Sequence, residues 1–408
     1  MVKIGYNLSM NKFKPIKTLG LIAVIIVVAF SLFACIDFSL LGGESQGGDQ
    51  DHGGISGPSF SIDTKINVSE VVPVNDSSLA DMIERVNDSV VELNVKLKDG
   101  KSSAGSGVIV GFSDNGAGKD NHAYIITCQH VLEDASAGGI TVILTNGKKL
   151  IADYLGGVAD RDIAVIKVKY EAGMVKADFR KVSEAPLRLG EEVVAIGNPL
   201  GTLGGTITRG IVSGLARSIR IDGTTMTLLQ TDASINSGNS GGALFDYSGT
   251  LVGIVNAKVV GTNVEGLGFA IPIGDTPNED GSVVVGARKI FQDITDTAND
   301  PSNPYGGLGY IPGKFMLGIT TTTARTPSGV ETYTVVDINP YGSLAGRVSK
   351  GDILVSLDGK TFSTTHTLSD AMKTLKIGDS VEFGVRKGNN TSPVAVTIRQ
   401  FVYGFVYP

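Results

Sequence analysis

Thr231-Asp232-Ala233-Ser234-Ile235-Asn236-Ser237-Gly238-Asn239-Ser240-Gly241-Gly242 places one serine, Ser240, between glycines in a run of small and polar residues. Serine is a poor nucleophile at neutral pH unless an imidazole takes its proton and a carboxylate orients that imidazole. Glycine reaches dihedrals that other residues avoid, so such a loop can aim the N–H groups of Gly238 and Ser240 at one point. The segment therefore predicts a nucleophilic serine with an oxyanion hole.

Two segments upstream supply the partners that a nucleophilic serine needs. The run IITCQHVL places His130 at the end of an apolar strand, and the run DRDIAVI places Asp162 directly before another apolar strand. Asp160 is a competing carboxylate two residues earlier. The sequence therefore predicts His130 as general base and one of these two aspartates as the group that orients it.

The cysteines and the other histidines restrict the remaining chemistry. Two cysteines cannot form a disulfide framework or a cysteine-rich zinc site. Cys128 lies two residues before His130 on an extended segment, which makes it an alternative nucleophile, but no glycine-framed loop surrounds it. His52, His122 and His366 show no metal-ligand spacing, so we expect no metal and no cofactor.

Composition excludes several classes of protein. With 42% hydrophobic and 19% charged residues, the chain of 408 residues can bury a core, which argues against a disordered protein. Its 54 glycines are roughly twice the usual share, without a G-X-Y period, and indicate many turns between short strands. The net charge of -6 without a basic stripe gives no sign of nucleic-acid binding.

Strand-like runs separated by Gly-, Asn- and Asp-rich turns fill the middle of the chain. No long helical pattern separates them, so antiparallel β barrels are favoured over a parallel α/β sheet, and we expect an all-β dominated fold. A short helix should open this unit at Leu79, with Ser77 and Ser78 as candidate caps. The strand-like runs are 90–95, 108–110, 123–127, 141–144, 163–168, 193–196 and 251–255.

A change of texture divides the chain into a first unit over 76–275 and a second over 313–403. The segment 276–312 between them is polar and rich in Gly and Pro, and is expected to be a linker with one short helix near 284–294. In the second unit a helix should begin near Thr367, with Asp370 completing a capping box.

The N-terminal end has the pattern of an export signal. Residues 1–17 carry lysines and no acidic residue, and the apolar run 18–36 approaches the roughly 20 residues that cross a bilayer. The run ends on Ser-Leu-Phe-Ala-Cys, which resembles a bacterial lipobox with Cys35 as the lipidated residue. A lipoprotein, an uncleaved signal anchor and a cleaved soluble product remain alternatives. Residues 37–75 are expected to be a flexible Gly-rich linker that lets a domain stand off the membrane.

The order His, Asp, Ser and the motif GNSGG resemble the trypsin-like serine proteases of the HtrA/Deg family. The resemblance covers residues 79–402 and implies a double β barrel with His130, Asp162 and Ser240 in the cleft between the barrels, and an oxyanion hole from Gly238 and Ser240. One departure is Cys128, where the family usually has Asn. Further matching motifs are AIGNPLG at 195–201, TRGIVS at 208–213 and GLGFAIP at 266–272.

By family position the substrate pocket should be lined by two short segments. Ile235 would narrow the pocket and make it apolar, so we expect cleavage after small or medium aliphatic residues. Lys258 would instead attract an acidic residue. The residues of this predicted pocket are Ile235, Asn236, Asn256, Ala257 and Lys258.

The second unit resembles a PDZ domain, which implies that it binds a peptide C-terminus by β-augmentation, with the helix from Thr367 as the other wall. A domain that only packs against the protease and controls it is the alternative. The predicted carboxylate-binding loop is Phe315, Met316, Leu317, Gly318 and Ile319.

The resemblance implies an extracytoplasmic serine endopeptidase that forms homotrimers and cleaves unfolded or damaged proteins. The N-terminal pattern adds the expectation that this endopeptidase is bacterial and tethered to the membrane. The resemblance also implies loops that rearrange on activation, and the Gly- and Asn-rich segments 112–121 and 259–266 suit that role. An alternative from another class is a chaperone or peptide-binding scaffold that uses the same cleft and PDZ groove without hydrolysis. An intact triad argues against that alternative, because a scaffold has no use for three catalytic side chains.

Overall fold

The computed structural model describes residues 66–73, 78–113, 121–197, 205–221, 224–257, 266–277, 281–303, 305, 307–340 and 342–400. The predicted basic segment 1–17, the apolar segment 18–36 with Cys35, and Lys258 lie outside these residues. Among the helices of the described part, none is long and apolar enough to cross a membrane.

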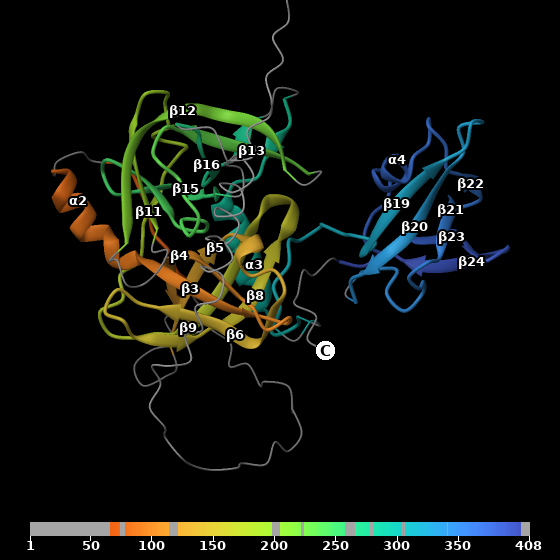
Figure 1. Cartoon of the computed structure of the whole chain (residues 1–408), viewed down its shortest axis with the longest axis horizontal. Helices are drawn as coiled ribbons and strands as arrows, with labels where there is room; N and C mark the ends of the chain where they lie inside the picture. Colours follow the sequence, from red (N-terminus) through yellow and green to blue (C-terminus); the bar gives the residue numbers. More distant parts are fainter. Residues whose placement is uncertain are drawn as a thin grey trace, which may run out of the picture. The chain divides into compact units, whose positions relative to one another are not determined.

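A first sheet is built entirely from antiparallel neighbours, in the order β7-β6-β3-β4-β5-β9-β8, with β1 paired to β4. Figure 1 labels its strands β3, β4, β5, β6, β8 and β9. Its central strands are buried on both faces, as in β5, where five consecutive residues are buried. The strands are β1 (Ile66–Asn67), β3 (Val90–Leu97), β4 (Ser102–Ser113), β5 (His122–Thr127), β6 (Ala135–Ile143), β7 (Lys149–Ile151), β8 (Asp153–Val158) and β9 (Ile163–Lys169).

A second sheet has the order β14-β11-β12-β13-β16-β15-β10-β2 and closes on itself because β14 also pairs with β15. Six strands of this sheet thus form a closed antiparallel barrel, as the sequence predicts, and β10 adds in parallel to β15 and β2. The strands are β2 (Glu70–Val71), β10 (Phe179–Arg180), β11 (Glu192–Gly197), β12 (Thr206–Ile221), β13 (Thr224–Thr231), β14 (Ala243–Asp246), β15 (Leu251–Val255) and β16 (Gly268–Pro272).

The helix expected at Leu79 is confirmed as α2 (Leu79–Val86). Ser78 caps it, and Asp81 completes a capping box by accepting from the Ser78 backbone N–H. The residues of its apolar stripe, Met82 and Val86, are buried in the same core as the first sheet. Ser77, the other candidate cap, lies outside the described residues.

Two segments expected to be linkers contain folded structure. Within 37–75, β1 pairs with β4 and β2 pairs with β10, so the predicted flexible spacer must end before residue 66. Within 276–312, β17 (Thr276–Pro277) pairs with β18 (Val283–Val284), and α3 (Ala287–Ala298) buries its apolar face in the core of the first sheet, against β8 and β9. These elements are short and surrounded by polar residues and Gly/Pro, which hides them from a composition-based boundary.

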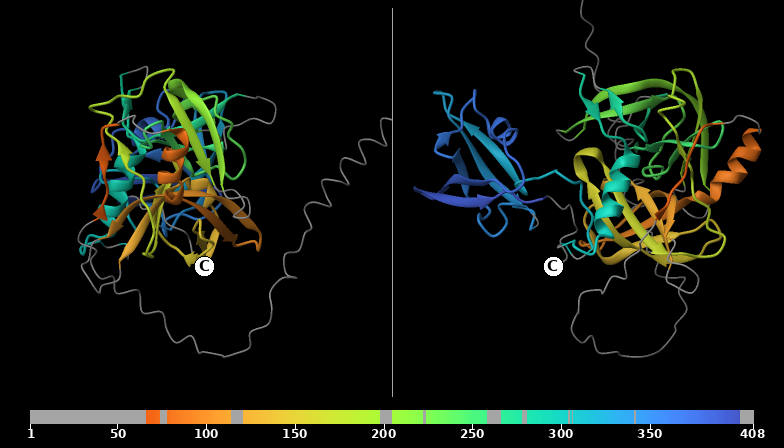
Figure 2. Two further views of the ribbon diagram at one scale, coloured as in Figure 1. Left: turned by 90° about the vertical axis from the view of Figure 1, so that its left-hand side faces the viewer. Right: turned by 180° about the vertical axis from the view of Figure 1, so that it is seen from behind.

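The C-terminal unit has its own core, formed around Leu344, Phe362 and Phe383. Its sheet has the order β19-β20-β21-β23-β24, with β22 paired to β21 (Figure 1). Figure 2 shows this unit, coloured blue, from two further sides. The predicted helix is α4 (Leu368–Met372), and Thr367 and Asp370 form the expected capping box. The strands are β19 (Ile319–Arg325), β20 (Glu331–Ile338), β21 (Ile353–Leu357), β22 (Lys360–Thr361), β23 (Ser380–Lys387) and β24 (Asn390–Thr397).

Candidate active site

The structure brings together the three residues that the sequence singles out. His130 lies on the 3-10 turn η3 (Gln129–Val131) after β5, and Ser240 lies on the loop between β13 and β14. The Nδ1 atom of His130 is 2.6 Å from Oδ2 of Asp162, and its Nε2 atom is 3.0 Å from Oγ of Ser240. This geometry allows the imidazole to accept the serine proton while the carboxylate holds the opposite ring nitrogen.

Asp162 owes its position to a tight turn. It follows the 3-10 turn η4 (Ala159–Arg161) with a left-handed backbone, φ 52°, which aspartate tolerates better than most residues. From there its Oδ1 atom also accepts the backbone N–H of His130 at 2.8 Å. The competing Asp160 is exposed instead, and its carboxylate pairs with Lys314 at 2.6 Å.

The side chain of Asn256 also contacts the carboxylate of Asp162, a role that the sequence did not predict. Asn256 is fully buried, and its Nδ2 atom donates to Oδ2 of Asp162 at 2.8 Å. The side chain of Asn256 is therefore directed at Asp162, and the role of the segment Asn256-Ala257 in the substrate pocket stays a prediction. A strand pattern shows that this position is near the site, but it does not show which way the side chain points.

The other predicted pocket residues differ in exposure. Ile235 is buried and packs beneath Gly268, where a Cβ would lie 2.6 Å from Cγ1 of Ile235, so it does not lie open to a substrate. Asn236 is exposed. The backbone N–H of Ala257 donates to Oγ of Ser240 at 3.1 Å, which places the end of β15 beside the nucleophile.

The backbone conformation around Ser240 requires glycine at two positions. Gly238 has φ +95° and Gly241 has φ +82°, both in the region that side chains avoid. A Cβ on Gly241 would also lie 3.0 Å from the amide nitrogen of Cys128. In the described part of the chain, the amides of Gly238 and Ser240 have no hydrogen-bond acceptor, as donors to an oxyanion require.

Cys128 lies behind the site and is fully buried, with its Sγ atom 3.3 Å from the carbonyl oxygen of Val255. Burial, reinforced by the charge of Asp162, raises the pKa of the thiol well above its usual range. Because the thiolate is the reactive form, this thiol is a poor nucleophile. Ligand atoms of Cys128, His130 and Asp162 lie within 4.8 Å of one another, but a neutral buried thiol is also a poor metal ligand, so the absence of a metal stays a prediction.

Ser106 on β4 contacts the loop that carries Ser240, and the sequence did not predict this contact. Its backbone N–H donates to the carbonyl oxygen of Ser240, and its Oγ donates to that of Gly238, both at 2.8 Å. The residue lies in the run Gly-Ser-Gly at 105–107, a small-residue signal that could have drawn attention to it.

The predicted peptide-binding loop has the arrangement of an anion cradle. Phe315 forms a β-bridge with Gln400, and Ile319 begins β19. Gly318 has φ +75°, and in the described residues the amides of Leu317 and Gly318 have no hydrogen-bond acceptor. Amides left free in this way can bind a carboxylate. The loop carbonyls of Met316, Leu317 and Gly318 accept from the backbone N–H groups of Ser343, Leu344 and Asn339.

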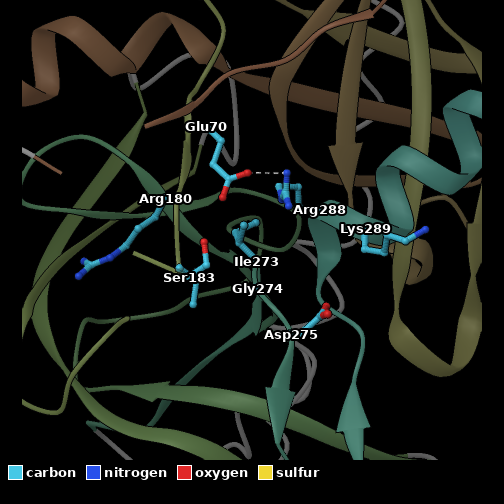
Figure 3. A pocket seen from close by; sticks show the side chains of 9 residues that line it. Glu70, Arg180, Ser183, Ile273, Gly274, Asp275, Arg288 and Lys289 are labelled. Atoms are coloured by element: carbon cyan, nitrogen blue, oxygen red, sulfur yellow. Dashed lines mark ion pairs between the residues drawn. The ribbon is translucent and has the colours of Figure 1, made fainter. Parts of the chain in front are cut away.

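A cavity of about 310 Å³ lies elsewhere on the molecule (Figure 3). None of His130, Asp162 and Ser240 lines it. Its charged side chains already have partners: Arg288 pairs with Glu70 at 2.6 Å and Arg180 with Glu191 at 2.7 Å. Lys289 pairs with Asp293, and Asp275 accepts the backbone N–H of Gly286. We therefore assign no ligand to it.

Each of the two units of this chain matches a known protein family. The family model for the trypsin-like peptidase domain matches residues 105–254, and the model for the PDZ domain matches residues 316–398. The chain is 34% identical to the serine protease Do-like HtrB of Bacillus subtilis over 348 residues, covering 79% of this chain and 71% of the relative. It is 32% identical to the serine protease Do-like HtrA of the same organism, covering 79% and 73%.

Among solved structures, the serine endoprotease from Yersinia pestis is 27% identical to this chain. The match covers 80% of this chain and 99% of the other, with a TM-score of 0.43.

Proposed function

Because the chain belongs to the HtrA family of trypsin-like serine endopeptidases with a C-terminal PDZ domain, we propose that His130, Asp162 and Ser240 are its catalytic triad. The observation that carries this proposal is the line of contacts from Asp162 through both ring nitrogens of His130 to Ser240, at 2.6 and 3.0 Å.

In the proposed mechanism, Oγ of Ser240 attacks the scissile carbonyl carbon while its proton moves to Nε2 of His130. Asp162 holds the tautomer with hydrogen on Nδ1 and stabilises the imidazolium. The amides of Gly238 and Ser240 bind the oxyanion. The imidazolium then gives its proton to the leaving amine as the C–N bond breaks, and water releases the acyl group by the same steps in reverse.

The substrates we propose are unfolded or damaged proteins, with the PDZ domain binding peptide C-termini. β19 supports this role because it is an edge strand, paired only with β20 among the described strands, and it begins at the loop with the free amides of Leu317 and Gly318. An extended peptide can pair with such an edge while its carboxylate binds the loop.

We also propose that the chain acts outside the cytoplasm, tethered to the membrane through residues 18–36 or through a lipid on Cys35, and that it assembles as a homotrimer. The basic and apolar pattern of the N-terminal end supports the tether. The homotrimer is proposed on family membership.

Digestion of casein tests the proposed activity. The full-length chain in detergent should digest casein, and Ser240→Ala should reduce the rate at least about 10³-fold, because the nucleophile is lost. Equal rates for the two proteins, across temperatures and with added C-terminal peptides, would refute the proposal.

A further inference from the structure

Ser106 ties the first sheet to the nucleophile loop through two hydrogen bonds. It is fully buried on β4, and its hydroxyl donates to the carbonyl oxygen of Gly238 at 2.8 Å. Its backbone N–H donates to the carbonyl oxygen of Ser240, also at 2.8 Å. One residue therefore holds both ends of the tripeptide Gly238-Asn239-Ser240, whose first and last amides are the proposed oxyanion donors.

Two other backbone hydrogen bonds support the tripeptide. The N–H of Asn239, which shares a peptide plane with the carbonyl of Gly238, donates to the carbonyl oxygen of Asn236 at 3.0 Å. The amide of Ser240 is fixed from within the loop, because the carbonyl oxygen of Asn239 in the same peptide plane accepts the N–H of Gly242 at 2.9 Å. Gly238 has φ +95° and the conformational freedom of glycine. The side chain of Asn239 is 1% exposed, yet within the described residues neither of its polar atoms has a hydrogen-bond partner, so it does not anchor the loop.

Ser106 is also linked to the segment that carries the base. Its carbonyl oxygen accepts the hydroxyl of Thr127 at 2.7 Å, and Thr127 ends β5 three residues before His130. The contacts of Ser106 therefore join the histidine segment to the serine loop.

We propose that Ser106 is a positioning residue for the oxyanion hole. Together with the bond from Asn239 to Asn236, its hydroxyl fixes the peptide plane that contains the carbonyl of Gly238, and this limits the rotation at Gly238 that would turn its N–H away from the developing oxyanion. This inference rests on the proposed function. Ser106 touches neither the substrate nor the reacting atoms, and its effect passes through Gly238.

The test compares Ser106→Ala with Ser89→Ala in the full-length protein. Ser89 is a matched control, because it is also fully buried and its hydroxyl also donates to a backbone carbonyl, that of Val86, at 2.6 Å. Loss of an oxyanion donor costs about 10²–10³ in kcat, and a donor that is only loosened should cost less, about 10-fold. We expect this loss in kcat for Ser106→Ala, with KM within about two-fold, and unchanged kinetics for Ser89→Ala.

A peptide boronate gives a second measurement, since its tetrahedral adduct occupies the oxyanion hole. Its affinity should fall in Ser106→Ala by the same factor as kcat/KM, and Ser106→Thr, which keeps the hydroxyl, should recover most of both. Both alanine variants should lose similar thermal stability. Unchanged kcat per folded molecule in Ser106→Ala, or equal kinetic losses in Ser89→Ala, would overturn the inference. A wild-type protein without Ser240-dependent cleavage would instead overturn the proposed function.

Discussion

The carboxylate of Asp162 accepts three hydrogen bonds. Oδ1 accepts the backbone N–H of His130, and Oδ2 accepts from the His130 ring and from the buried amide of Asn256. Carboxylates held in this way cannot rotate, and an imidazole paired with them keeps one tautomer. The left-handed turn at Asp162 is therefore part of the geometry that the proposed mechanism requires.

Two aspartates separated by one residue provide a matched pair of variants. Asp162→Asn should lower kcat by about 10⁴-fold, because the amide favours the wrong tautomer of His130. Asp160→Asn should keep kcat within about two-fold, since Asp160 is an exposed partner of Lys314 and exposed ion pairs contribute little. Steady-state kinetics on a peptide substrate decide the matter. A large loss in Asp160→Asn and none in Asp162→Asn would reverse the assignment.

Cys128 should not react with thiol reagents in the native protein. Burial raises the pKa of its thiol and leaves no exposed surface, so iodoacetamide at pH 8 should not label it or reduce activity. Labelling should appear once the protein is unfolded in denaturant. Peptide mass mapping distinguishes Cys128 from Cys35. Rapid native labelling of Cys128 with parallel loss of activity would favour a cysteine nucleophile.

At the scale of elements, a nearly buried ion cluster connects strands of the second sheet. Arg180 on β10 pairs with Glu191, just before β11, at 2.7 Å, and with Asp246 at the end of β14 at 3.1 Å. Burial alone would raise the pKa of Glu191, but hydrogen bonds from Arg188 and Arg180 outweigh it and hold the pKa below its usual value of 4.5. The cluster therefore links three strands only while Glu191 is ionised.

Because the pKa of Glu191 is lower in the folded than in the unfolded protein, its ionised form stabilises the fold. This stabilisation is fully present above the pKa of the unfolded state and is lost as the pH falls through the pKa of the folded state. Glu191→Gln should thus be less stable than wild type by about 1.5–3 kcal/mol at pH 7, and the difference should shrink below about pH 4.5. Denaturant unfolding between pH 7 and 3 measures this. Glu184→Gln, which alters the exposed pair with Lys181, serves as control and should change little. A difference independent of pH would contradict the role of the Glu191 charge.

For the whole molecule, the proposed tether predicts a location that can be measured. The full-length chain should sediment with membranes and be released by detergent, whereas deletion of 1–36 should leave it soluble, because that deletion removes both Cys35 and the apolar run. Mass spectrometry of the mature N-terminus then separates the two forms of tether: an acylated Cys35 indicates a lipoprotein, and an uncut N-terminus indicates a signal anchor. A full-length chain found only in the soluble fraction would refute both.

Much of the site could be predicted because its chemistry imposes local patterns. The loop that carries Ser240 needs glycines for its backbone conformation. His130 directly follows one buried strand and Asp162 directly precedes another, so each has an apolar run next to it in the sequence. Two helices were predictable for the same reason: α4 from a capping box within four residues, and α2 from its apolar spacing after a serine cap. In each case the decisive atoms belong to neighbouring residues.

Only the tertiary structure decided the contacts between distant segments. Asn256 reaches Asp162 across 94 residues, and Ser106 reaches Gly238 across 132. It also decided that β1 and β2 pair into the two sheets and that α3 packs into the first core, although their surroundings look like linkers. The physical reason is the same in each case: which face of a strand or helix becomes buried depends on what packs against it, and no local pattern specifies a partner a hundred residues away.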